Sequence, residues 1–93
     1  MTNPIAGTYY QHRYGGIYIV EIPKVLSTVD KSEWVVYSHV YPFEAGVVWS
    51  RPHAEWTDGR FREIDTAELH VFLDKDRETF QNEITETKKL AKG

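Results

Sequence analysis

The sequence contains no cysteine and a single methionine. Without cysteine the chain can form no disulfide bond, thiolate nucleophile or zinc–cysteine site. No stretch of the sequence approaches the roughly 20 apolar residues that a membrane-spanning helix needs. The first residues also lack the basic and apolar regions of a signal peptide. We therefore expect a cytoplasmic protein without a membrane partner.

Positive charge is also scarce. Eleven Lys and Arg residues stand against 14 Asp and Glu residues, which gives a formal net charge of −3. This balance disfavours strong non-specific binding to nucleic acid, which depends on many phosphate contacts. A local basic patch remains compatible with it. The chain has 93 residues, which is enough for one domain with one modest hydrophobic core.

Aromatic residues are concentrated in the first part of the chain, where 11 of the 13 lie within residues 1–64. β-Branched and aromatic residues in this part predict five strands, at residues 8–14, 17–22, 33–41, 47–51 and 60–64. Pro23 is expected to end the second strand, and Trp56 to begin a further short one. Gly15-Gly16 is typical of a two-residue hairpin turn of the primed type.

Residues 65–93 have a different pattern, with many charges and few aromatics. Asp65 and Glu68 have the spacing of a helix-capping box, so a short helix is expected to follow. A thin apolar stripe from Leu73 to Ala91, near helical period, predicts a C-terminal helix that packs through Phe80 and Ile84. The predicted fold is thus α+β and mainly β, with about five strands in a small SH3-like bent sheet or barrel. Residues 1–64 form its body and residues 65–93 a helical tail packed on that body.

Sequence motifs of known catalytic and metal sites are missing. The four histidines, at positions 12, 39, 53 and 70, show no metal-binding spacing, and Gly-x-Ser-x-Gly does not occur. No pair of carboxylates is distinguished as acid and base. We therefore predict no metal site, no cofactor and no catalytic residue. A small enzyme that uses His12 or His53 is kept as the third hypothesis.

Three strands each carry a pair of aromatic or basic residues on one side, because side chains alternate along a strand. The pairs are Tyr10 and His12, Tyr37 and His39, and Trp49 and Arg51. If the strands are neighbours, these residues form an aromatic and basic patch. Such a patch suits planar, anionic or nucleotide-like ligands through stacking and bidentate hydrogen bonds. The alternative interpretation is that this face is the core of the barrel.

The preferred hypothesis is a non-catalytic module that binds a small anionic or nucleotide-like ligand, or a short nucleic-acid or peptide segment. Arg51 is then a recognition residue held by Trp49; otherwise it braces a carboxylate. A ligand phosphate beside His12 would favour its protonated form. The second hypothesis is a protein-interaction module in which the C-terminal helix docks a partner or a second copy, as in a homodimer.

The residues also resemble a known family, domain of unknown function 1653. The similarity covers roughly residues 7–63, and its elements are Tyr10-Gln11-His12, Gly15, Tyr18, Val35-Val36-Tyr37, Tyr41, Trp49-Ser50-Arg51-Pro52 and Trp56. Tyr14 departs from the family pattern, which often has Lys there, and residues 23–34 lack its Arg-His-Ser signature. The resemblance implies a compact β-rich domain of bacteria and their phages, and no established activity.

Five further residues are expected to have structural roles in turns, strand ends or packing. They are Gly15, Gly16, Tyr18, Pro52 and Trp56.

Overall fold

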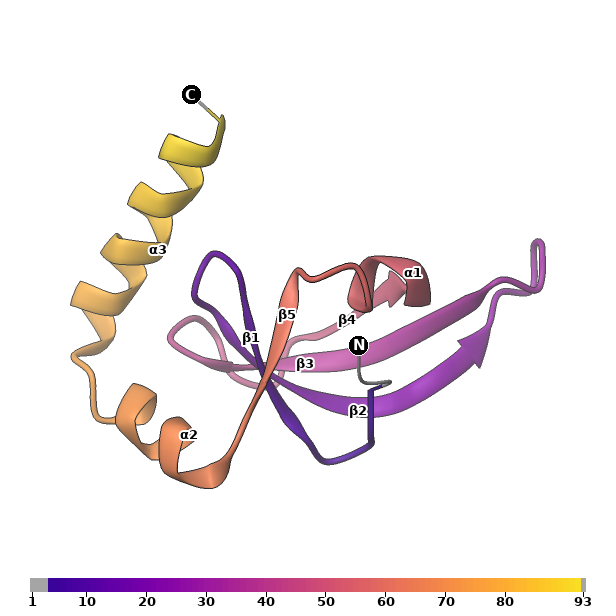
Figure 1. The fold of residues 1–93 in the computed structure, drawn as a ribbon, viewed down its shortest axis with the longest axis horizontal. Helices are drawn as coiled ribbons and strands as arrows, with labels where there is room; N and C mark the ends of the chain where they lie inside the picture. The colour runs from indigo at the N-terminus through magenta and orange to yellow at the C-terminus, as the bar shows by residue number, and fades with distance from the viewer. Residues whose placement is uncertain (1–3, 93) are drawn as a thin grey trace.

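A computed structural model describes residues 4–92 as an α+β domain built on one antiparallel sheet of five strands (Figure 1). The strands are β1 (Tyr9–His12), β2 (Ile17–Leu26), β3 (Glu33–Tyr41), β4 (Val48–Pro52) and β5 (Phe61–Ile64). The helices are α1 (His53–Trp56), α2 (Thr66–Leu73) and α3 (Arg77–Lys92). The predicted class, the bent five-strand sheet and the C-terminal helix are confirmed. The strand order β4-β3-β2-β1-β5 leaves the sheet open rather than closed into a barrel.

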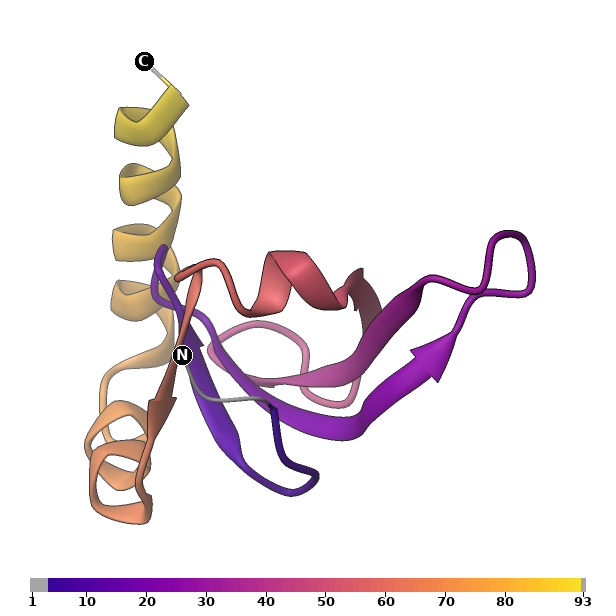
Figure 2. The same ribbon diagram turned by 45° about the vertical axis from the view of Figure 1, so that its right-hand side comes forward.

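Strand β2 is longer than the sequence pattern predicts. The prediction that Pro23 ends the strand is wrong, because β2 continues to Leu26. The pairing with β3 shifts register between Val20 and Ile22 and again between Ile22 and Val25. Such irregularities allow a proline inside a strand, because the missing N–H then removes no regular ladder bond. The result is a long β2–β3 hairpin that extends away from α2 and α3 (Figures 1 and 2).

The β1–β2 connection is a hairpin, as predicted, but not a two-residue primed turn. Strand β1 ends at His12, and four residues, 13–16, lead into β2. Gly15 donates its N–H to the His12 carbonyl at 2.7 Å and has a φ of +118°, whereas Gly16 has no positive φ. A Cβ on Gly15 would lie 2.9 Å from Cγ1 of Ile84. Gly15 is therefore needed both for its backbone conformation and for the close approach of α3.

The segment after β4 is helical, so the prediction that Trp56 begins a strand is wrong. Pro52 ends β4 and stands at the N-terminus of α1, where its missing N–H costs no helical hydrogen bond. One turn of helix directs Trp56 onto the sheet, where it is buried. Its ring lies 5.2 Å from that of Tyr10 and 4.9 Å from that of Tyr37.

Two hydrophobic cores lie on opposite sides of the sheet. The first lies under α1 and consists of Tyr10, Val20, Val35, Tyr37 and Trp56. The second joins the sheet to α2 and α3 and consists of Ile17, Ile64, Leu69, Phe80 and Ile84. This second core confirms that the tail packs through Phe80 and Ile84.

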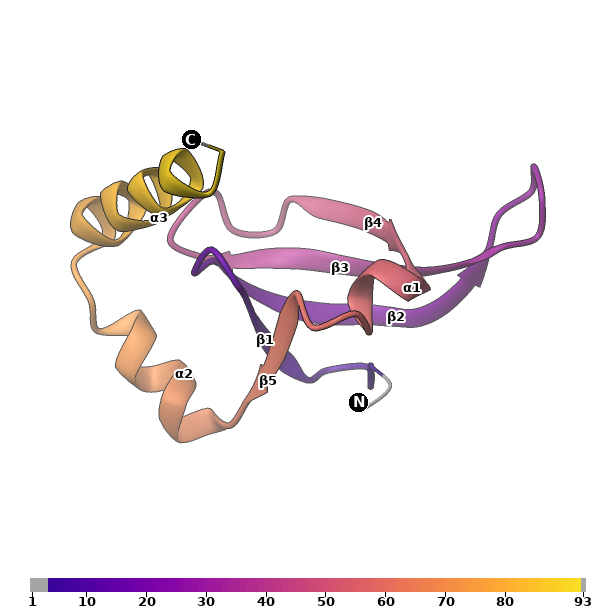
Figure 3. The ribbon, with the colours of Figure 1, turned by 45° about the horizontal axis from the view of Figure 1, so that its top comes forward.

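The tail contains two helices, as predicted, but the second begins at Arg77 rather than at Leu73. Leu73 ends α2, and α3 begins at Arg77. Asp65 caps α2 as predicted, because its Oδ1 accepts the Glu68 N–H at 2.8 Å. Asp76 caps α3 in the same way, through the Thr79 N–H at 2.9 Å. Figure 3 shows α3 beside the β1–β2 and β3–β4 loops.

Candidate functional site

The strand register brings all six predicted ligand-binding residues to one face of the sheet, here called the α1 face. Residues directly opposite each other in antiparallel strands point to the same side. Tyr10 pairs with Tyr18, and Tyr18 with His39. On the other side of β3, Tyr37 pairs with Trp49 and Val35 with Arg51. The full set on this face is Tyr10, His12, Tyr37, His39, Trp49 and Arg51, with Tyr18 at its centre.

Part of the α1 face is hydrophobic core. Tyr10 and Tyr37 are only 3% and 5% exposed, because the indole of Trp56 covers them. Burial also raises the pKa of the Tyr10 hydroxyl. Tyr10 and Tyr37 therefore belong to the hydrophobic core, as in the alternative interpretation of this face. A ligand cannot reach Tyr10 without displacing α1.

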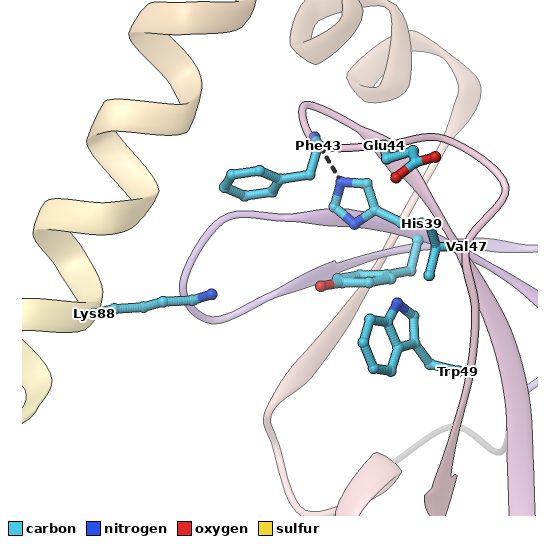
Figure 4. Close-up of a pocket in the computed structure, with 7 residues that line it drawn as sticks. His39, Phe43, Glu44, Val47, Trp49 and Lys88 are labelled. Carbon is cyan, nitrogen blue, oxygen red and sulfur yellow. Dashed lines mark hydrogen bonds between the residues drawn. The ribbon is translucent and has the colours of Figure 1, made fainter.

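The rest of the α1 face is open and holds two adjoining pockets. One, the basic pocket, has a volume of about 350 Å³ and is lined by His12, Arg13, Tyr14, Tyr18, Arg51, Arg60 and Lys88. The other, the aromatic pocket, has a volume of about 390 Å³ and is lined by Tyr18, His39, Phe43, Glu44, Val47, Trp49 and Lys88 (Figure 4). Tyr18 and Lys88 line both pockets, so the two spaces adjoin at these side chains, and together they are here called the groove.

Four cationic side chains surround the basic pocket, and two of them are partly neutralised. Arg51 and Arg60 share the carboxylate of Glu55, at 3.4 and 3.2 Å. Within residues 4–92, neither Arg13 nor Lys88 forms an ion pair. Arg13 and Lys88 therefore supply charge to the pocket that no carboxylate of the described chain offsets by direct contact.

Arg51 is both braced and open to the basic pocket. Its Nε donates to the Tyr37 hydroxyl at 3.3 Å, and its guanidinium carbon lies 5.4 Å from the ring centre of Phe61. Together with Glu55, these groups position the guanidinium. Trp49 lies on the same strand face but lines the aromatic pocket instead. The side chain of Arg51 is 25% exposed, which leaves part of the guanidinium available to a ligand.

His12 stands in the basic pocket as a neutral ring. Its Nδ1 accepts the Tyr14 backbone N–H at 3.1 Å, which a protonated Nδ1 cannot do. The pKa of His12 is lowered to about 4, first by burial and then by the nearby positive charges of Arg51, Arg13, Lys88 and Arg60, in that order. These four cations are the ones that line the pocket.

His39 forms part of the aromatic pocket and is also neutral. Its Nε2 accepts the Phe43 backbone N–H at 2.9 Å, shown by the dashed line in Figure 4. Burial lowers its pKa to about 4, with smaller contributions from Lys88 and Arg77. The hydrogen bond ties β3 to the loop that carries Phe43, and this loop is one wall of the aromatic pocket.

Of the four Lys and Arg residues that line the basic pocket, the sequence patterns predicted only Arg51 and missed Arg13, Arg60 and Lys88. Arg13 and Arg60 lie in adjacent turns, and the Arg13 N–H donates to the Arg60 carbonyl at 2.8 Å. Neither has a sequence signal beyond being next to a predicted strand. Lys88 does have one, since it lies four residues after Ile84 and so on the same side of the helix. A helix that packs through Ile84 directs Lys88 toward the sheet.

The expected structural residues are placed as follows. Gly16 and Tyr18 are neighbours, because a Cβ on Gly16 would lie 3.1 Å from the Tyr18 ring. Gly15, Pro52 and Trp56 have the roles in turn, strand end and core described above. Among residues 4–92, no group of three or more His, Asp or Glu side chains is arranged to hold a metal ion. The helices of the described chain are all too short or too polar to cross a membrane.

Comparisons with protein-family models, curated proteins and solved structures found no significant match. The resemblance to domain of unknown function 1653 therefore stays a prediction.

Proposed function

We propose that this chain is a non-catalytic binding module that takes a small anionic ligand in the basic pocket. The main support is that four cations line one pocket of about 350 Å³ and none of its lining residues is acidic. Guanidinium and ammonium groups donate charge-assisted hydrogen bonds to phosphate and carboxylate oxygens, and these bonds are stronger than neutral ones. Three of the four cations are arginines, whose planar forks suit such oxygens.

The state of His12 fits the same ligand class. Its Nδ1 is occupied as an acceptor, so the ring proton is on Nε2, where the ring is a hydrogen-bond donor. A donor beside four cations offers an anion a further hydrogen bond. An anion that binds there also offsets the charges that lower the pKa of His12, so the pKa rises on binding.

The same hydrogen bonds argue against His12 and His39 as general bases. A base needs a free lone pair on a ring nitrogen within reach of the substrate. In both residues that lone pair already accepts a backbone N–H. Each histidine would have to give up this bond before it could take a proton, which supports binding rather than catalysis by these two residues.

Isothermal titration with inorganic pyrophosphate, at about 0.15 M ionic strength and neutral pH, tests the proposal. The informative variants are Arg13→Gln and Lys88→Gln, because neither residue forms an ion pair within residues 4–92. A hydrogen bond to a charged group is worth about 1.5–3 kcal/mol, so each variant is expected to bind about tenfold more weakly or worse. Arg51 is a poorer choice, because its side chain also holds Glu55 and Tyr37.

Lys89→Gln is the matched control. Lys89 is the next residue on α3, its side chain is 70% exposed, and it faces Glu86 rather than the pocket. Lys89→Gln removes the same net charge but no side chain of the basic pocket. Its affinity for pyrophosphate should therefore stay within about twofold of that of the wild type. Absence of pyrophosphate binding, or an equal loss of affinity in all three variants, would contradict the proposal.

A second candidate, the protein-interaction module, is supported by the C-terminal half of α3. This part of the helix projects beyond the sheet (Figures 1 and 2), and Leu90 is 81% exposed. Sedimentation equilibrium measures the oligomeric state directly. A dimer that dissociates in Leu90→Ala would support this candidate, and a monomer at all concentrations would contradict it.

A further inference from the structure

We infer that the ligand of the groove is a phosphate joined to a planar aromatic base, as in a nucleoside monophosphate, with the phosphate in the basic pocket and the base on Trp49. This inference rests on the proposed function and adds the class of ligand and its direction in the groove.

The first reason is that the two pockets adjoin. Tyr18 and Lys88 line both, so the cationic space and the aromatic one meet at these two side chains. Each volume, about 350 and 390 Å³, lies near the lower end of the range of small-molecule sites, about 300–1,000 Å³. One small ligand with two chemically different ends can therefore occupy both spaces.

The second reason is the exposure of Trp49. Trp49 is 55% exposed although its neighbour across the strands, Tyr37, is buried. In Figure 4, Trp49 from β4 and Phe43 from the β3–β4 loop lie on either side of the pocket, and Lys88 extends toward it from α3. An uncovered indole beside a cationic space is the arrangement on which bases stack in nucleotide-binding proteins, with little preference for the base.

The third reason is the distribution of charge along the groove. The basic pocket has no acidic lining residue, whereas Glu44 lines the aromatic pocket. A carboxylate repels a phosphate and accepts hydrogen bonds from ring N–H and amino groups. The groove therefore has a cationic end for the phosphate and an aromatic end, with an acceptor, for the base.

Isothermal titration with four probes tests this inference: AMP, ribose phosphate, inorganic pyrophosphate and a short oligothymidylate. The variant is Trp49→Leu, and the matched control is Trp34→Leu, which removes an indole outside both pockets. We expect AMP to bind the wild type at least tenfold tighter than ribose phosphate, a difference of about 1.4 kcal/mol. Trp49→Leu should abolish this difference and leave pyrophosphate binding unchanged, while Trp34→Leu should preserve it.

The outcomes separate this inference from the proposed function. Equal affinity for AMP and ribose phosphate would overturn the inference and leave the anion site intact. Failure of AMP, ribose phosphate and pyrophosphate to bind would overturn both. If the oligothymidylate binds much more tightly than AMP, the ligand is a nucleic-acid strand, and the assignment to a mononucleotide is wrong.

Discussion

Acidification is expected to destabilise the protein through His39 before its carboxylates are protonated. The pKa of His39 is lowered from 6.5 to about 4 in the folded chain. A base with a lowered folded pKa contributes its full stability above the unfolded value, and loses it as the pH falls toward the folded value. At about 1.4 kcal/mol per pKa unit, His39 contributes roughly 3 kcal/mol at neutral pH. Roughly 2 kcal/mol of this is lost by about pH 5.

The physical cause of this loss is visible in the contacts of His39. The ring is 5% exposed, and its Nε2 accepts the Phe43 N–H at 2.9 Å, so protonation removes a buried acceptor. The nearby charges, Lys88 and Arg77, are both positive and come from α3. His12 is expected to add a smaller loss of the same sign, since its ring is less buried and its Nδ1 accepts the Tyr14 N–H.

Urea unfolding followed by circular dichroism, at about pH 7.5, 6 and 5, measures the effect. His39→Gln keeps an acceptor for the Phe43 N–H but cannot be protonated, and His12→Asn does the same for the Tyr14 N–H. For each variant, the free energy of unfolding at each pH is compared with the value for the same variant at neutral pH. A loss of stability that is equal at every pH therefore does not affect the result. We expect the double variant to lose much less stability between neutral pH and about pH 5 than the wild type.

The control is His70→Gln, which changes an exposed histidine on α2. It should keep the pH dependence of the wild type. Three carboxyls of the described chain have a lowered pKa, those of Asp30, Glu33 and Asp76. Because their ordinary pKa values are 3.8 to 4.5, the stability that they contribute at neutral pH is lost mainly below this range. A double variant that loses as much stability as the wild type by about pH 5 would refute the role of both histidines.

Two further predictions concern the contact of α3 with the sheet. Gly15→Ala should lower the free energy of unfolding by more than Gly59→Ala. Both glycines have positive φ, but only a Cβ at Gly15 would meet Ile84. Equal losses of stability in urea unfolding would contradict this prediction. Phe80→Ala should cost about 3–5 kcal/mol, because Phe80 is 3% exposed in the second core. Leu90→Ala, at an exposed position, should change stability by less than about 0.5 kcal/mol, and a loss similar to that of Phe80→Ala would show that α3 packs differently.

The sequence pattern was sufficient to predict which residues share one side of a strand, but not which of them are buried. Alternation along each strand predicts that Tyr37 and His39 share one side of their strand, and Trp49 and Arg51 one side of theirs, because strand parity depends only on local spacing. That the two pairs lie on the same face follows from the β3–β4 register. Which of these residues are covered depends on α1. That helix is a single turn, too short to have a helical period in the sequence, and it buries Tyr37 but not Trp49.

The cationic pocket was the least predictable part of the site. Arg13 and Arg60 are brought together by the pairing of β1 with β5, which are about 50 residues apart in the chain. Lys88 reaches the basic pocket because α3 packs closely against Gly15 in the β1–β2 loop. The prediction that Pro23 ends β2 failed because bulges, which only the β2–β3 register reveals, allow the strand to continue past the proline.

If both proposals hold, one groove binds an anion at one end and an aromatic base at the other. Two-dimensional ¹H–¹⁵N NMR of the labelled protein, titrated with pyrophosphate and then in a separate sample with AMP, observes both ends at once. The Tyr14 amide, which bonds to His12, reports on the basic pocket, and the Trp49 indole N–H on the aromatic one. Pyrophosphate is predicted to shift the Tyr14 signal alone, and AMP to shift both signals with one saturation curve, while the Trp34 indole stays in place. If saturating AMP leaves both the Tyr14 and the Trp49 signals unmoved, AMP does not bind in the groove and the proposed ligand is wrong.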